Sequence, residues 1–143
     1  MEHLPLQEIY DKTIEYLLSM PGPSVGTTGS FRYRGLNDRK CAVGFWISDE
    51  KYNFIMEGHY VHYPVVRNAL PKEVNYPAGL ALLSELQMTV HDKSWKPLLE
   101  DGKQKTILRE EDIVPWDLDL LRSNVAEVAR LHNLTPYQIP GGR

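Results

Sequence analysis

Apolar side chains recur at helical spacing near the start of the chain. Over residues 6–18 the apolar positions are Leu6, Ile9, Tyr10, Ile14, Leu17 and Leu18. Charged residues occupy the opposite face, and this pattern predicts an amphipathic helix with one buried stripe. Pro21, Gly22 and Pro23 follow the stripe and predict the end of the helix.

The second half of the chain carries two more helical patterns. Pro77 can occupy the first turn of a helix whose apolar side includes Leu80, Leu83 and Leu86, and which ends near His91. A last helix is predicted from the region of 112–115 to Asn133. Short helices are expected after Ser48 and after Pro64, whereas residues 93–105 are predicted to form an irregular loop.

Residues 31–47 alternate as strands do. Cys41, Val43, Phe45 and Ile47 share one face, while Ala42, Gly44 and Trp46 share the other. The turn-forming residues 35–38 precede them, so the pattern predicts an antiparallel hairpin. A glycine inside a strand, here Gly44, often marks a bulge or a close approach of another backbone segment.

These elements predict an α+β fold, with a short antiparallel β-hairpin or small sheet packed against four or five helices. The length of 143 residues suits a single domain over residues 1–143. Residues 135–143 contain two Pro and two Gly, and we expect them to be an extended or mobile tail.

Charge and cysteine content narrow the function classes. A net charge of −3 argues against general nucleic-acid binding, which needs a surplus of Lys and Arg. No apolar stretch approaches the roughly 20 residues that span a bilayer, and the acidic N-terminal residues do not resemble a signal peptide. The single cysteine fits a reducing compartment, so we expect a cytoplasmic protein without membrane contact.

Cys41 is the first candidate for chemistry. A thiolate nucleophile needs a base, and His91, followed by Asp92, is the best candidate in the sequence. His59 and His62 are rivals for that role. The other interpretation is that Cys41 is a small buried residue of the apolar row, since free cysteines are often buried.

Metal and phosphate motifs are weak. Glu57, His59 and His62 lie close together, but their spacing does not place both imidazoles on one helical face. We therefore expect an exposed loop here and no metal. The glycines of residues 21–29 lack the lysine of a phosphate loop, and no cofactor is predicted.

Two further features allow either a binding role or a structural one. Gln87 and His91 are four residues apart on a predicted helix, so their side chains are neighbours, but a histidine at a helix C-terminus is also explained by the helix dipole alone. Trp46 lies on the strand face opposite Cys41, where it is either an exposed anchor for a ligand or part of the core.

Two motifs carry a resemblance to known proteins. The first comprises the run 40–44 (Lys-Cys-Ala-Val-Gly), Ile47, Asp49, Glu50, Tyr52 and the run 56–58 (Met-Glu-Gly), and the second comprises Leu86, Gln87, His91 and Asp92. Through them, residues 31–95 resemble a family of small, functionally uncharacterised proteins of bacteriophages and bacteria. The resemblance implies no particular reaction, but it draws attention to these residues as a group. If the hairpin packs on the 77–92 helix, they would line one cleft.

The sequence thus favours a non-catalytic accessory protein that binds a protein partner or a small-molecule ligand, in a phage context implied by the resemblance alone. The abundance of Tyr and Trp is typical of binding surfaces. The candidate ligand-binding residues are Trp46, Asp49, Glu50, Tyr52, Glu57 and Gln87. The alternative is a cysteine-dependent hydrolase or transferase that uses Cys41, His91 and Asp92.

Overall fold

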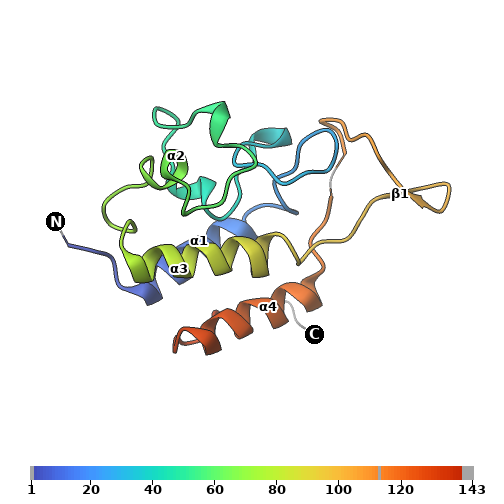
Figure 1. Ribbon diagram of the computed structural model, residues 1–143. Coiled ribbons are helices and arrows are strands. Elements are labelled where there is room, and N and C mark those ends of the chain that lie inside the picture. The colour runs from blue at the N-terminus through green and yellow to red at the C-terminus, as the bar shows by residue number, and fades with distance from the viewer. Residues whose placement is uncertain (1, 113, 140–143) are drawn as a thin grey trace.

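Three helices form the frame of the protein. The computed structural model describes residues 2–112 and 114–139. The long helices are α1 (Leu6–Leu18), α3 (Pro77–Glu85) and α4 (Leu118–Leu131). The helix α3 runs directly into η4 (Leu86–His91), a π-helical segment. Figure 1 shows this combined helix between α4 on one side and the irregular middle of the chain on the other.

The helix ends follow the local chemistry. Pro77 occupies the first turn of α3, where its missing N–H breaks no hydrogen bond. The Asp117 carboxylate accepts the backbone N–H of Leu120 at 3.2 Å and caps α4. The three helices predicted from the apolar stripes are confirmed, although α4 begins a few residues later than expected.

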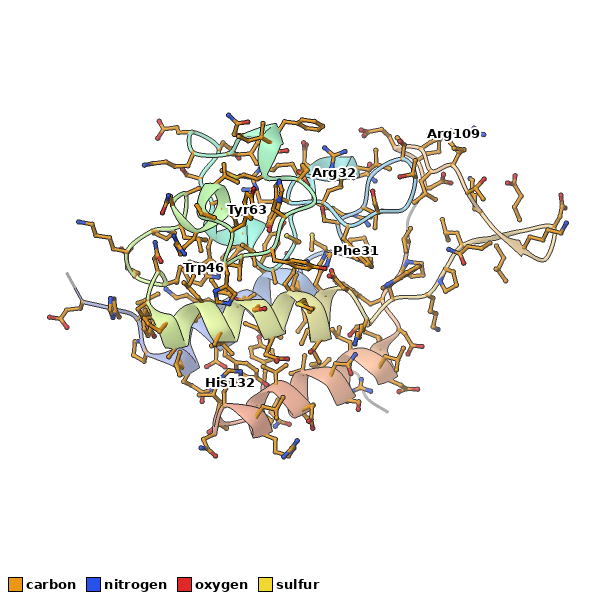
Figure 2. The ribbon with its side chains drawn as sticks, in the orientation of Figure 1. Phe31, Arg32, Trp46, Tyr63, Arg109 and His132 are labelled. Carbon is orange, nitrogen blue, oxygen red and sulfur yellow. The ribbon has the colours of Figure 1, made fainter. Side chains whose placement is uncertain are left out.

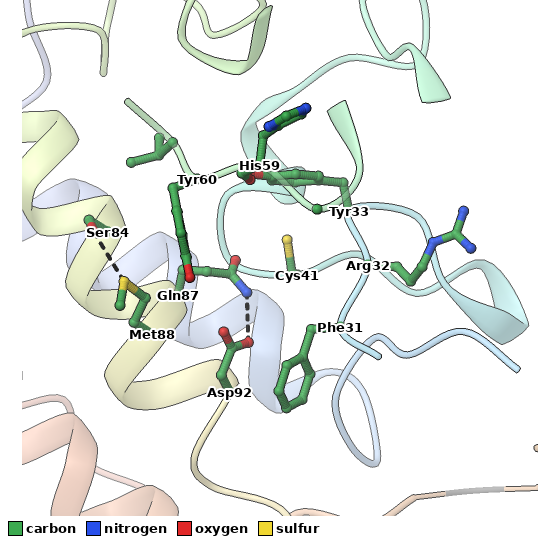
Figure 3. A pocket seen from close by; sticks show the side chains of 12 residues that line it. Phe31, Arg32, Tyr33, Cys41, His59, Tyr60, Ser84, Gln87, Met88 and Asp92 are labelled. Carbon is green, nitrogen blue, oxygen red and sulfur yellow. Dashed lines mark hydrogen bonds between the residues drawn. The ribbon is translucent and has the colours of Figure 1, made fainter. Parts of the chain in front are cut away.

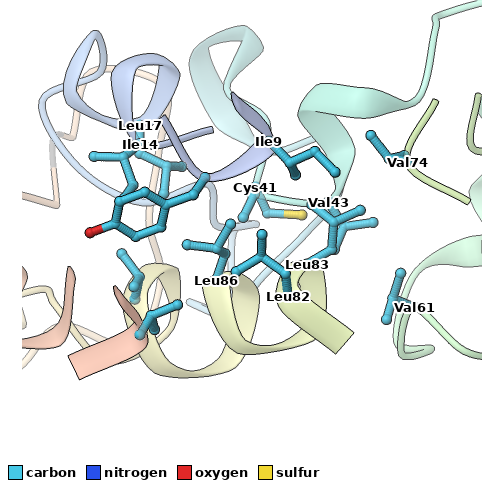
Figure 4. Close-up of a cluster of buried hydrophobic side chains, with 14 of the residues drawn as sticks. Ile9, Ile14, Leu17, Cys41, Val43, Val61, Val74, Leu82, Leu83 and Leu86 are labelled. Atoms are coloured by element: carbon cyan, nitrogen blue, oxygen red, sulfur yellow. The ribbon is translucent and has the colours of Figure 1, made fainter. Parts of the chain in front are cut away.

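The core lies where α1, the α3–η4 helix and α4 meet. The helix α1 contacts both α3 and η4, and η4 contacts α4. Figure 4 shows side chains of α1 and α3–η4 packed around Cys41 and Val43, which come from the irregular middle segment. The fully buried members include Ile9, Ile14, Leu17, Leu82, Leu83 and Leu86. Burial of this apolar surface is the main source of stability.

The part of the chain that connects α1 to α3 contains several short helical segments. They are η1 (Leu36–Asp38), η2 (Gly44–Trp46), η3 (Phe54–Met56) and α2 (Pro64–Arg67). The short helix after Pro64 is confirmed. The helix expected directly after Ser48 is replaced by a turn and then η3, where the Asn53 side chain caps the N–H of Ile55 at 3.0 Å.

The predicted hairpin over residues 31–47 is wrong. Apart from a single bridge between Val25 and Phe31, this segment has no strand pairing. The two strands of the described residues are β1 (Leu99–Glu100) and β2 (Lys103–Gln104), which form an exposed antiparallel hairpin within the predicted loop 93–105. Figure 1 shows this hairpin projecting away from the helices.

Side chains from distant elements replace the missing strand pairing. The Glu57 carboxylate accepts the backbone N–H groups of Tyr33 and Arg34, at 2.9 and 3.1 Å. The Gln87 amide oxygen accepts the N–H of Val43 at 3.2 Å. Backbone polar groups are thereby satisfied without a sheet, because buried N–H groups need an acceptor of some kind.

Gly44 marks a close approach of two backbone segments, as its position in the sequence indicated. A Cβ atom at this residue would lie 2.6 Å from the carbonyl oxygen of Tyr33. Any larger residue would therefore force the two segments apart.

The fold is thus mostly helical, with one short antiparallel hairpin. No helix among the described residues is long and apolar enough to cross a membrane. Of the predicted tail, residues 135–139 have no regular secondary structure, and Gln7 bonds both the N–H and the carbonyl of Thr135 at 2.8 and 2.9 Å. Residues 140–143 lie outside the described part of the chain.

Candidate functional site

A cavity of about 220 Å³ opens beside the α3–η4 helix. Three parts of the chain form it: residues 31–33 with Cys41, the loop 58–61, and one side of the helix. Figure 3 shows Gln87 and Asp92 reaching in from the helix, with aromatic rings around them. Small-molecule sites are typically concave and mostly apolar, with a few polar groups, and this cavity has that composition.

Cys41 forms part of the cavity wall, but its thiol is held in the protein interior. The residue is 2% exposed, and its sulfur accepts the N–H of Gly44 at 3.3 Å. Burial raises the pKa of the Cys41 thiol to about 12. The thiol is therefore protonated at neutral pH, whereas a cysteine nucleophile needs its thiolate.

The ring of His91 is fully buried and both of its nitrogens are engaged. Nε2 accepts the backbone N–H of Ser24 at 2.9 Å. In the neutral ring, Nδ1 therefore carries the proton and donates it to Oδ1 of Asp92 at 2.7 Å. None of the hydrogen bonds of the described residues joins this imidazole to Cys41, so the predicted nucleophile and base are not paired.

Gln87 connects the helix to the cavity. Its amide nitrogen donates a hydrogen bond to Oδ1 of Asp92 at 2.8 Å, while its oxygen accepts one from the backbone N–H of Val43. The π-helical geometry supports this arrangement, since the N–H of Asp92 bonds the carbonyl of Gln87 five residues earlier, at 2.9 Å. Cys41, Gln87 and Asp92 are thus brought together at one cavity.

Glu57 organises the wall of the cavity and is not free to meet a ligand. Besides the two backbone N–H groups described above, it accepts the Tyr52 hydroxyl at 2.7 Å and lies 3.5 Å from the Arg32 guanidinium. Its side chain is 10% exposed. Tyr52 and Glu57 therefore form a structural cluster beside the cavity and do not line it.

The other predicted ligand-binding residues lie elsewhere. Asp49 is exposed and pairs with Arg34 at 3.1 Å, and Glu50 is also exposed. The Trp46 indole donates to the Thr13 hydroxyl at 2.8 Å and lines a separate hollow. The single cleft expected for all of these residues is not formed, because the segment that holds them turns instead of running as a strand.

The two loop histidines are not arranged as metal ligands. The rings of His59 and Tyr63 stack with centroids 4.0 Å apart, and His62 is exposed. Within residues 2–112 and 114–139, no group of three or more His, Cys, Asp or Glu side chains is placed to hold a metal ion.

Of the twelve residues that line the cavity, only Cys41, Gln87 and Asp92 were among the predicted site residues. The large aromatic or apolar side chains that were missed are Phe31, Tyr33, Tyr60 and Met88. Phe31 lies at the C-terminal end of the α3–η4 helix, with its ring 5.6 Å from that of His91 (Figure 2). The sequence contained a signal for Met88, which is an apolar residue next to Gln87 and outside the predicted stripe; the structure leaves it 43% exposed. Phe31 and Tyr33 come from one segment and Tyr60 from the loop 58–61, and no sequence signal placed that loop beside the other two residues.

The two motifs that carry the resemblance to phage and bacterial proteins meet at this cavity, through Cys41 and Gly58 from the first and Gln87 and Asp92 from the second. The resemblance itself stays an expectation. Comparison of the chain with protein-family models, with curated proteins and with solved structures gave no match.

Proposed function

We propose that this protein is a non-catalytic accessory protein that binds a small ligand in the cavity beside the α3–η4 helix. The observation that carries the proposal is the position of Gln87 and Asp92. Their polar atoms reach a cavity whose other walls include Phe31, Tyr33 and Tyr60. Such a set can orient a ligand by hydrogen bonds and bury its apolar part.

A protein partner is the second candidate, and a specific observation favours it. Phe54, Ile55, Tyr60 and Tyr63 are 68%, 62%, 69% and 50% exposed. These apolar side chains come from one stretch of chain that also supplies one wall of the cavity. Exposed apolar patches are typical of interaction sites, and this stretch supplies side chains for such a patch. The phage context would suit such a partner but rests on resemblance alone.

A cysteine-dependent hydrolase or transferase receives less support. In its favour, Cys41 lies on the cavity wall near Gln87 and Asp92. Against it, the thiol is buried and protonated, and His91 Nε2 already accepts a hydrogen bond from the backbone N–H of Ser24. A nucleophile needs a base within hydrogen-bond reach, which this arrangement does not provide.

A fragment screen followed by ¹H–¹⁵N NMR spectroscopy tests the proposal. We expect hits that shift the amide signals of Tyr33, Val61 and Gln87, which surround the cavity. The substitution Ser84→Phe places a ring at the cavity wall and should abolish these shifts. The control is Ser123→Phe, on the exposed face of α4, which should leave them unchanged.

Two results would count against a ligand cavity here. One is a screen in which no fragment shifts these signals. The other is a set of hits that Ser84→Phe and Ser123→Phe affect equally. If the hits instead cluster on Phe54 and Ile55 and survive Ser84→Phe, the exposed apolar stretch becomes the binding site.

A further inference from the structure

We infer that the ligand of this cavity is a small organic cation, such as a primary or methylated ammonium compound. This inference rests on the proposed function, because it names the ligand class of the same cavity. Three features carry it: a carboxylate with one oxygen that accepts no hydrogen bond, a wall of aromatic rings, and a nearby guanidinium that is ion-paired with Glu57.

The carboxylate is that of Asp92. Its Oδ1 accepts hydrogen bonds from His91 Nδ1 at 2.7 Å and from Gln87 Nε2 at 2.8 Å, so the orientation of the group is fixed. Among the described residues, no hydrogen bond or ion pair engages Oδ2. The side chain is 24% exposed and lines the cavity. A fixed anion with an unused oxygen is a suitable partner for an ammonium group.

The aromatic wall favours the same charge. Phe31, Tyr33 and Tyr60 line the cavity, and Figure 3 shows the rings of Phe31 and Tyr60 on either side of the Asp92 carboxylate in that view. The faces of aromatic rings carry negative partial charge and attract cations, and quaternary ammonium groups are recognised in this way. Tyr33 is 6% exposed, so part of this wall is shielded from water, where the attraction is stronger.

Positive charge near the cavity is already matched. Arg32 is the one Arg or Lys among the described residues that line it. Its Nε forms an ion pair with Glu57 at 3.5 Å, although no hydrogen bond satisfies this buried nitrogen. Its guanidinium also lies over the Phe54 ring, 5.3 Å from the centroid. Figure 3 shows the head of Arg32 directed away from Asp92. An anionic ligand would meet the Asp92 carboxylate, whereas a cation meets no unmatched like charge.

The size of the cavity limits the ligand. A volume of about 220 Å³ is below the roughly 300–1,000 Å³ of sites for drug-sized molecules. A trimethylammonium group with a short chain, or an amine with one ring, is of suitable size. A nucleotide is too large and carries the wrong charge.

Titration with choline and with its uncharged carbon isostere tests the inference. In the isostere a tert-butyl group replaces the trimethylammonium group, so shape is kept and charge is removed. At constant ionic strength we expect choline to bind about tenfold more tightly. Asp92→Asn keeps an Oδ1 acceptor for His91 and Gln87, and it should abolish the preference. Asp119→Asn, at a 97% exposed side chain of α4, makes the same change in net charge and should preserve it.

A second pair of variants covers the case in which Asp92→Asn does not fold. Tyr60 is 69% exposed, so its substitution should be tolerated. Tyr60→Leu should reduce choline binding several-fold with little effect on the isostere, whereas Tyr60→Phe keeps the ring and should keep the preference.

Equal binding of choline and the isostere would overturn the inference while the proposed cavity function stands. So would a failure of both probes when other fragments bind and Ser84→Phe removes them. If no fragment of any charge binds, the proposed function itself is wrong.

Discussion

His91 Nε2 accepts the backbone N–H of Ser24 at 2.9 Å, and this bond joins the end of the α3–η4 helix to the loop that follows α1. Ser24 continues the connection, since its hydroxyl donates to the carbonyl of Arg32 at 2.8 Å and is 3.1 Å from that of Arg39. The buried polar groups thus fix the loops that form one wall of the cavity. His91 acts as a structural hub that also positions Asp92.

Substitution of His91 should therefore destabilise the fold. His91→Phe keeps an aromatic ring, of somewhat larger size, but leaves the Ser24 N–H buried without an acceptor, which costs about 2 kcal/mol. The free energy of unfolding from urea titration measures the loss. The matched control, His62→Phe, lies at an exposed position and should change stability little. Equal stability of His91→Phe and the wild type would refute the structural role.

Glu57 should be equally sensitive, because one carboxylate satisfies the N–H groups of Tyr33 and Arg34 and the Tyr52 hydroxyl. Glu57→Ala removes charge-assisted hydrogen bonds and should lower the free energy of unfolding by about 2–3 kcal/mol. Glu50→Ala, at an exposed carboxylate, is the control. The two variants are compared in urea, and a loss of similar size in both would contradict this account.

The folded protein should react slowly with thiol reagents. Cys41 is 2% exposed and its thiol pKa is raised to about 12, so both access and thiolate formation are limited at neutral pH. Iodoacetamide labelling followed by mass spectrometry should show little modification in native buffer and complete modification in denaturant. Rapid stoichiometric labelling of the native protein at pH 7 would revive the cysteine-enzyme alternative.

Stability should fall in alkaline solution. The Cys41 thiol has its ordinary pKa near 9.0 when unfolded and about 12 when folded, because burial disfavours the thiolate. The contribution of the protonated thiol to the free energy of unfolding is complete below pH 9. It is lost as the pH rises toward 12, since the thiol loses its proton in the unfolded chain at a lower pH than in the folded protein. At pH 10 this group alone lowers the free energy of unfolding by the order of 1 kcal/mol.

The substitution Cys41→Ala tests that contribution. Unfolding free energies measured at pH 7 and pH 10 should differ less in Cys41→Ala than in the wild type. A remaining decline is expected from Tyr33, whose pKa burial also raises. An identical decline in both proteins would show that Cys41 takes no part in it.

Sequence periodicity located the helices because their burial is regular. The stripes of α1, α3 and α4 follow the helical repeat, and Pro77 marks a start that local sterics explain. The alternation of Cys41, Val43 and Ile47 was misleading. These three side chains are buried, at 2%, 0% and 1% exposure, but the segment is irregular and burial does not alternate along it. Phe45 of the same predicted face is only partly buried, whereas Ala42 of the opposite face is fully buried.

The partners that hold this segment are remote in sequence. The hydrogen bond between Gln87 and Val43 joins residues 44 positions apart in the sequence, and that between Glu57 and Tyr33 joins residues 24 positions apart. No local rule of strand or turn formation contains such contacts, so the hairpin prediction failed. For the same reason the sequence indicated Gln87 and Asp92 as site residues but could not place Phe31 or Tyr60 beside them.

One measurement tests the central claim, binding without turnover, most directly. The best fragment or ammonium compound is added in excess to ¹⁵N-labelled protein, and both molecules are followed by NMR over a prolonged incubation. We expect saturable shifts at Tyr33, Val61 and Gln87, with the ligand signals chemically unchanged throughout. Chemical conversion of the ligand by the wild type, together with no conversion by Cys41→Ala, would contradict the account and establish catalysis at this cavity.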